Sequence, residues 1–179
     1  MEFCSAPRLD FPLPGWKMWL AACGPSGNRK RSRRCVPLLA GKCCGDMIAV
    51  DTNVLVRLLT GDDPRQAAAA RSLFARESIW IAKTVLIETG WVLRSLYGFE
   101  DTSIRDAFTK LLGLENVQAE DVPSIRAALA LTAHGVEFAD AMHLSSRPPG
   151  AQFVTFDKSF VRRANRAGVT GISSISGKH

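Results

Sequence analysis

The feature that most constrains this chain is a regular alternation, after residue 47, of short runs suited to strands with longer segments of helical periodicity. The strand-like runs are Ile48–Val50, Ile79–Ala82, Asn116–Gln118, Gln152–Thr155 and Val169–Ile172. Helices are expected between them, over residues 53–60, 63–77, 84–97, 103–112, 121–134, 138–145 and 159–167. Strands that alternate with helices predict an α/β fold, a three-layer sandwich with a mainly parallel central sheet.

Residues 1–46 differ in composition from residues 47–179, and we place a domain boundary between them. The first segment holds 8 Lys and Arg against 3 Asp and Glu, five prolines, five glycines and all five cysteines. It has no helical or alternating apolar period, so it cannot bury enough apolar surface to offset the entropy lost on ordering. We expect a disordered extension, or translated sequence upstream of a natural start at Met47.

Three functional interpretations of residues 1–46 compete with disorder. A signal peptide needs 7–15 consecutive apolar residues, and prolines, a glycine and a lysine interrupt the candidate core. Zinc binding by the cysteines is disfavoured because the segment has no Cys-x-x-Cys pair. The basic run at residues 29–34 has the charge needed to contact RNA without sequence specificity.

The hydropathy of the chain gives no reason to expect a transmembrane helix. No stretch approaches 18 consecutive apolar residues, and the mean hydropathy is +0.02. The net charge of +6 suggests an anionic partner, but residues 47–179 hold 15 basic against 14 acidic side chains. We therefore expect a cytoplasmic protein whose main domain is nearly neutral.

Two aspartates directly follow predicted strands. Asp51 follows the first strand and Asp157 follows the fourth. Ligand sites in parallel sheets lie at the carboxyl ends of the strands, so both side chains are candidates for a functional site. The alternative is that each aspartate only caps the helix that follows it.

Two further acids lie inside apolar helical segments. Glu88 has Thr84, Val85, Trp91 and Val92 as its helical neighbours, and Asp140 lies among Phe138, Met142 and Leu144. We expect both carboxylates to be buried, and a buried carboxylate needs a partner. That partner is either a metal ion or, in the alternative interpretation, a nearby Arg or Lys.

The four acids predict a metal site only if their side chains lie close together in the folded protein. Two carboxylates about 4 Å apart repel by roughly 4 kcal/mol at an effective dielectric constant near 20. A cation would compensate this repulsion, and oxygen ligands of this kind favour Mg²⁺ or Mn²⁺. The hypothesis is thus one pocket formed by Asp51, Glu88, Asp140 and Asp157 around one or two divalent ions.

Four stretches of residues 47–179 resemble a known family. They are Ile48–Leu55, Ile87–Glu88 ahead of Trp91–Leu93, Phe138–Leu144, and Val154–Phe160. In this order they resemble a PIN-domain ribonuclease, specifically a VapC-type toxin of bacterial toxin–antitoxin pairs. The resemblance implies a metal-dependent endoribonuclease that a small antitoxin protein inhibits and that forms homodimers. Its acidic anchors match Asp51, Glu88, Asp140 and Asp157, and residues 1–46 have no counterpart.

The expected chemistry is metal-assisted hydrolysis of RNA phosphodiester bonds, in which a divalent ion activates a water and stabilises the leaving oxygen. The four acids would be both the catalytic residues and the metal ligands. Residues expected to support them are Thr52, Asn53 and Thr155. Residues expected to contact RNA phosphates are Lys83, Lys158, Arg162, Arg163 and Arg166, although the last three also suit a solvated helix face.

Three other functions remain open from the sequence. One is a nuclease that acts on DNA, since a metal ion and carboxylates do not select the sugar. A phosphoacceptor signalling domain also has an aspartate at a strand end, but it needs a strand-end lysine, which we do not find near the fourth or fifth strand. A non-catalytic RNA-binding module would use the basic segment, but the chain lacks an aromatic platform of the kind that stacks single-stranded RNA.

Overall fold

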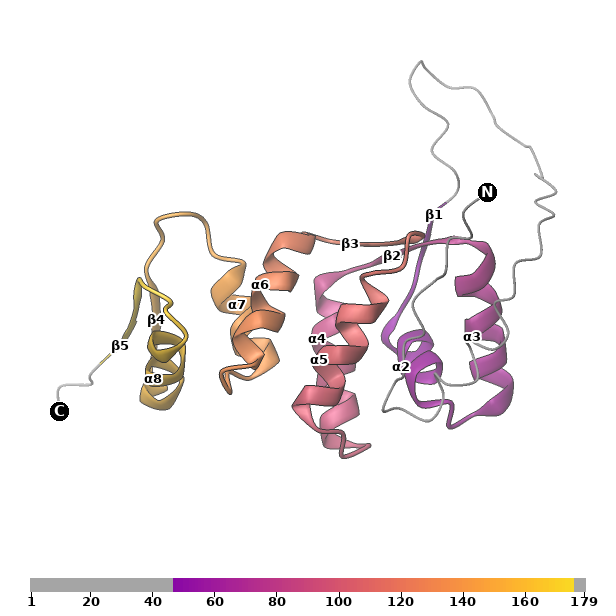
Figure 1. The fold of residues 1–179 in the computed structure, drawn as a ribbon, viewed down its shortest axis with the longest axis horizontal. Helices are drawn as coiled ribbons and strands as arrows, with labels where there is room; N and C mark the ends of the chain where they lie inside the picture. The colour runs from indigo at the N-terminus through magenta and orange to yellow at the C-terminus, as the bar shows by residue number, and fades with distance from the viewer. Residues whose placement is uncertain (1–46, 176–179) are drawn as a thin grey trace, which may run out of the picture.

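The computed structural model describes residues 47–175, in which short parallel strands alternate with helices (Figure 1). The strands are β1 (Met47–Ala49), β2 (Ser78–Ile81), β3 (Val117–Ala119), β4 (Phe153–Thr155) and β5 (Ile172–Ser174). The expected α/β class is confirmed. The interpretations that concern residues 1–46 lie outside the described residues.

The helices begin and end close to the positions that the sequence indicates. They are α2 (Thr52–Thr60), α3 (Pro64–Arg76), α4 (Lys83–Ser95), α5 (Asp101–Leu111), α6 (Val122–Thr132), α7 (Phe138–Ser145) and α8 (Lys158–Arg166). Local chemistry explains several of these ends. Asp63 accepts backbone N–H groups at the start of α3, and Pro64 occupies its first position. Gly61 ends α2 in the left-handed conformation, with φ of 69°.

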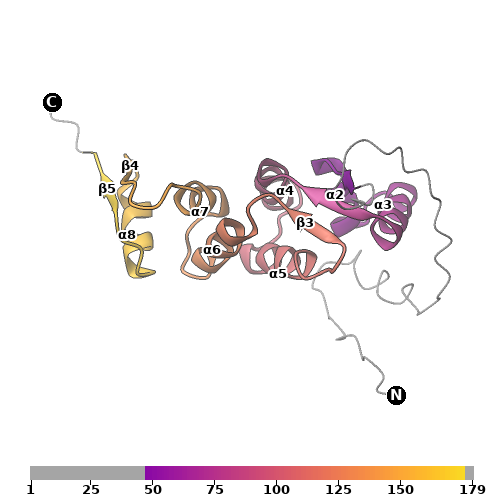
Figure 2. The ribbon, with the colours of Figure 1, turned by 90° about the horizontal axis from the view of Figure 1, so that it is seen from above.

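Three strands form a parallel sheet in the order β1-β2-β3. Met47 pairs with Ser78 along the first ladder, and Ile79 pairs with Val117 along the second. Ile79 and Ile81 of the central strand are completely buried, so β2 anchors the sheet in the core. Figure 2 shows β3 between α4 and α5, so helices cover the sheet on both faces.

The other two strands form a separate parallel pair, because β4 and β5 hydrogen-bond to each other and not to the three-stranded sheet. We expected one central sheet. Figures 1 and 2 show α6 and α7 between the β4–β5 pair and the rest of the molecule, which keeps β4 away from β1. The carboxyl ends of β1 and β4 therefore lie in different parts of the molecule.

One predicted strand is displaced along the chain. We expected the last strand over Val169–Ile172, and β5 instead spans Ile172–Ser174. Gly168 and Gly171 both have positive φ, so the chain turns until Gly171 and can extend only after it. Within residues 47–175, no helix combines the length and the apolar character needed to span a lipid bilayer.

Candidate active site

Asp51 lies at the carboxyl end of the three-stranded sheet and begins α2. Buried Val50 separates it from β1, and its Oδ1 accepts the backbone N–H of Val54 at 3.0 Å. The capping interpretation therefore holds for this residue. The cap engages one carboxylate oxygen of an exposed side chain, so capping and a role in binding are compatible.

Glu88 is joined to the same region through Thr52, the first residue of α2. The Thr52 hydroxyl donates a hydrogen bond of 2.6 Å to Oε2 of Glu88, across 36 residues of chain. Thr52 itself is buried, which holds its hydroxyl in a defined position. The start of α2, which carries Asp51, is thus tied to the acid on α4.

The expectation that Glu88 is buried is wrong, because its side chain is exposed. The buried face of α4 consists of Leu86, Thr89, Gly90 and Leu93. Glu88 shares the opposite side with Thr84 and with Trp91, which is 56% exposed. Of its apolar neighbours, Val85 is partly buried against the core whereas Trp91 is exposed, so their presence does not bury Glu88.

Asp140 lies half-buried on α7, next to the buried residues Ala141 and Met142. Burial raises the pKa of the Asp140 carboxyl above its ordinary value, and the negative charges of Glu137 and Asp157 raise it further. The influence of Asp157 shows that these two acids, which are distant in sequence, lie within electrostatic range of each other.

Asp157 follows β4 and caps α8. Its Oδ1 accepts the backbone N–H groups of Ser159 at 2.7 Å and Phe160 at 3.0 Å, and its Oδ2 lies 3.8 Å from Nη2 of Arg163. Hydrogen bonds from Phe160 and Ser159 hold the pKa of Asp157 below its ordinary value, with a contribution from Arg163. Asp157 in turn donates its backbone N–H to the hydroxyl of Thr155.

The four acids form two groups and not one. Asp51 and Glu88 belong to the α2–α4 side, whereas Asp140 and Asp157 belong to α7 and α8, toward the other end of the molecule in Figure 1. Among residues 47–175, no three His, Cys, Asp or Glu side chains lie close enough together to hold a metal ion. The donors have the chemistry that Mg²⁺ prefers, but this arrangement does not fit a single ion held by all four.

The supporting residues that the sequence indicated are divided in the same way. Thr52 contacts Glu88, and Thr155 contacts the backbone of Asp157, whereas Asn53 is exposed. Of the five predicted phosphate contacts, Lys83 forms an ion pair with Asp121, and Arg163 lies beside Asp157. The remaining cations are exposed on α8: Lys158, Arg162 and Arg166.

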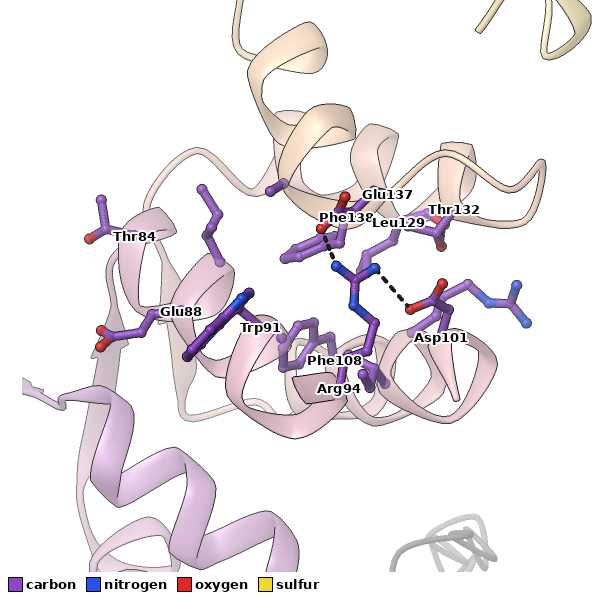
Figure 3. A pocket seen from close by; sticks show the side chains of 15 residues that line it. Thr84, Glu88, Trp91, Arg94, Asp101, Phe108, Leu129, Thr132, Glu137 and Phe138 are labelled. Carbon is purple, nitrogen blue, oxygen red and sulfur yellow. Dashed lines mark hydrogen bonds and ion pairs between the residues drawn. The ribbon is translucent and has the colours of Figure 1, made fainter. Parts of the chain in front are cut away.

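The sequence interpretation missed Arg94, whose guanidinium lies between two carboxylates. Arg94 extends from the last turn of α4 and forms ion pairs with Glu137 and, at 3.8 Å, with Asp101 (Figure 3). These side chains and Glu88 line one cavity between the helices α4 to α7. The sequence did contain one signal for Arg94. This residue lies three residues after Trp91, which places both side chains on one face of the helix.

Comparison with known proteins identifies the family. A family model described as PIN domain matches residues 48–166, about two thirds of the chain. No curated protein and no solved structure matched the chain. The family match begins at Ile48 within β1, which precedes Asp51, and extends through Glu88, Asp140 and Asp157 to the end of α8. The chain belongs to the PIN-domain family.

Proposed function

We propose that this chain is an endoribonuclease that requires a divalent cation, Mg²⁺ or Mn²⁺, and that it acts as the toxin of a toxin–antitoxin pair of the VapC type. Membership of the PIN family indicates nuclease activity in general. RNA as the substrate, the identity of the cation and the toxin role are the specific parts of the proposal.

The observation that carries the proposal is the link between Asp51 and Glu88 at the carboxyl end of the parallel sheet. The Thr52–Glu88 hydrogen bond ties Glu88 to the residue that follows Asp51, although Asp51 and Glu88 are 37 positions apart in the chain. The carboxyl ends of parallel strands are where α/β folds bind their ligands. Both side chains are exposed there, so a substrate can reach them.

We propose Asp51, Glu88, Asp140 and Asp157 as the catalytic and metal-binding residues. Their carboxylate oxygens are suitable donors for a hard divalent ion, which would supply an activated water and charge neutralisation to phosphodiester hydrolysis. Because the acids lie in two groups, we assign no chemical step to the ion. Residues proposed to contact the RNA backbone are the exposed cations of α8, Lys158, Arg162 and Arg166.

The proposed protein partners are an antitoxin and a second copy of the chain, in the cytoplasm. An apolar surface supports the need for a protein partner. Val154, Phe156 and Ile175 are exposed on and beside the β4–β5 pair, and Phe156 is 74% exposed. Exposed apolar groups that gather on one unit are typical of interaction surfaces.

The test is cleavage of a 5′-labelled RNA by the intact chain, with Mn²⁺ or with EDTA. We expect cuts at discrete positions with Mn²⁺ and none with EDTA. Asp51→Asn should abolish cleavage and retain the fold, because asparagine caps a helix as well as aspartate does. Asp63→Asn is the matched control, since Asp63 caps α3 away from the site and its replacement should leave cleavage unchanged.

Other outcomes would contradict the proposal and identify the alternatives. RNA binding without cleavage in Mn²⁺ would indicate a non-catalytic RNA-binding module. Labelling of Asp51 by a small phosphodonor would indicate a phosphoacceptor domain. Cleavage that is equally fast in EDTA and in the Asp51→Asn variant would exclude the proposed residues and the proposed cation together.

A further inference from the structure

The cavity between α4, α5, α6 and α7 has a volume of about 460 Å³ and mostly apolar walls. Small-molecule sites in proteins are typically of this size, with apolar walls and a few polar groups that fix the orientation of the ligand. The walls include Ile87, Ile104 and Leu129. A ligand of this cavity would need a flat apolar body and polar groups that complement the polar side chains of the walls.

Three aromatic side chains line the cavity, and of these Trp91 is exposed whereas Phe108 is completely buried. Figure 3 shows Trp91 and Phe108 along one side and Phe138 on the other. The Phe108 and Phe138 rings pack with centroids 5.3 Å apart, whereas Trp91 is 56% exposed. A Cβ atom at Gly90 would come within 3.3 Å of Phe138 and 3.5 Å of Phe108, so the glycine lets both rings pack closely against α4. Unpaired bases of RNA stack on exposed rings of this kind.

At the polar end of the cavity, a guanidinium donor lies between two carboxylate acceptors. The Arg94 guanidinium lies between the carboxylates of Glu137 and Asp101, and the three side chains are 38%, 43% and 61% exposed. Each carboxylate can accept further hydrogen bonds beside its ion pair. Guanine presents the complementary edge, because its O6 accepts while its adjacent N1–H and N2–H groups donate.

The cavity continues to the proposed active site. Glu88 and Thr84 line its other end, and Glu88 is the acid that Thr52 ties to the start of α2 (Figure 3). A base held in the cavity would therefore bring its own sugar and phosphate toward Glu88. This continuity favours a nucleotide of the substrate over an unrelated ligand.

We propose that the cavity binds an unpaired guanine base of the RNA substrate, stacked on Trp91 and recognised at its edge by Arg94 and Glu137. This inference rests on the proposed endoribonuclease function and adds the base that the enzyme selects. Trp91 and Arg94 become specificity-determining residues. Neither belongs to the proposed catalytic set.

The first test measures binding without catalysis, with the intact chain, EDTA and the four nucleoside 5′-monophosphates as probes. Isothermal titration calorimetry measures the affinity of every variant, and in the unmodified chain the Trp91 indole N–H signal in NMR spectra reports which site is occupied. We expect guanosine monophosphate to bind about ten-fold or more tightly than the cytidine and uridine probes. A difference of this size corresponds to about one good hydrogen-bonded contact to the base edge. Trp91→Ala should weaken binding about ten-fold, whereas Trp91→Phe should retain most of it.

Two further variants separate recognition of the base edge by Arg94 from stacking on Trp91. Arg94→Gln should remove the preference for guanosine and leave stacking, so the four probes bind with similar affinity. Leu96→Ala is the matched control, because Leu96 is 70% exposed just after the same helix but does not line the cavity. Equal binding of all four probes by the unmodified chain, or guanosine binding unchanged by Trp91→Ala, would overturn the inference.

The second test uses cleavage to separate the inference from the function on which it rests. In RNA substrates that differ at one unpaired position, guanine should lower KM, and Trp91→Ala should raise KM more than it lowers kcat. Efficient cleavage with no guanine preference would overturn the base site and leave the nuclease. Guanosine binding at Trp91 without any RNA cleavage would overturn the proposed function.

Discussion

Asp51 and Asp157 each follow a strand, and each combines helix capping with a candidate role in a binding site. Asp51 accepts one backbone N–H group through its Oδ1 and Asp157 accepts two, and so they begin α2 and α8. Each also has a candidate role in a binding site, since capping does not engage every lone pair of a carboxylate. The capping and functional interpretations of these residues are therefore not exclusive.

The Thr52–Glu88 hydrogen bond gives the first residue-scale prediction. Thr52→Val keeps the shape of the side chain and removes the hydroxyl donor, so we expect the free energy of unfolding to fall by about 1 kcal/mol. Urea denaturation measures this change. Thr102→Val, at an exposed position of α5, should change stability by less than about 0.5 kcal/mol. Equal changes in the free energy of unfolding for the two substitutions would mean that the Thr52–Glu88 hydrogen bond does not stabilise the fold.

The raised pKa of Asp140 gives a second prediction, on pH dependence. Because the pKa in the folded state lies above the unfolded value, the ionised carboxylate destabilises the fold at neutral pH. This penalty is absent below the unfolded pKa, about 3.9, and grows as the pH rises through the folded pKa. Asp140→Asn should therefore raise Tm at pH 7, and the gain should shrink as the pH falls.

Asp62 provides a control of opposite sign. Its hydrogen bond from Tyr97 and its contact with Arg57 hold the pKa of Asp62 well below its ordinary value. The ionised form therefore stabilises the fold above the unfolded pKa, and this contribution is lost as the pH falls toward the folded pKa. Asp62→Asn should lower Tm at pH 7, with a smaller loss in acid. Calorimetry at a series of pH values distinguishes the two variants, and equal signs would refute the assignment.

At the scale of elements, helix α4 connects the parts that matter for function. One of its faces packs in the core through Leu86 and Leu93, and another presents Glu88, Trp91 and Arg94 to a cavity. Its C-terminal end also lies near α2, where Tyr97 contacts Arg57 and Asp62. A single helix thus joins the sheet, the proposed acids and the proposed base site.

The packing of α5 against α4 and α7 gives a prediction at this scale. Phe108 of α5 is completely buried and packs on Phe138 of α7. Phe108→Ala should lower the free energy of unfolding by roughly 3–5 kcal/mol, because it removes a buried ring and leaves a void. Phe156→Ala, which removes a ring that is 74% exposed, should cost far less. Urea denaturation of both variants tests the difference, and similar losses would contradict this packing.

At the scale of the whole molecule, the division into two sheets should be visible in local stability. The three-stranded sheet has helices on both faces, whereas the β4–β5 pair lies at one end of the molecule (Figures 1 and 2). A two-stranded pair has little independent stability. The end of the molecule that contains Asp157 is therefore expected to open more readily than the end that contains Asp51.

Amide hydrogen exchange measures this prediction directly. The N–H of Ile79 bonds to Asn116 in the three-stranded sheet, and the N–H groups of Phe153 and Ile175 bond within the β4–β5 region. Exchange should be slower at Ile79 than at Phe153 and Ile175. Uniform protection of the three amides would show that both sheets open as one cooperative unit.

The elements and the acids could be predicted from the sequence, but their grouping could not. The periodicity located every helix and strand of residues 47–175 to within a few residues, and β5 moved only because Gly171 turns the chain. The exposure of Glu88 was predicted wrongly, since apolar residues occur on several sides of α4 and its buried face is the one that carries Leu86 and Leu93. Arg94 was missed because its partners Glu137 and Asp101 come from other helices.

From the sequence alone one could read the α/β order of elements, the capping aspartates, the four candidate acids and the resemblance that the family match confirmed at the level of the PIN domain. These features depend on neighbours within about one helical turn, or on residue identities along the chain. The pairing of β4 with β5, the two groups of acids and the cavity beside α4 became known only from the folded arrangement of the chain. Strand pairing and burial depend on contacts between segments far apart in the chain, and local periodicity carries no information about which segments those are.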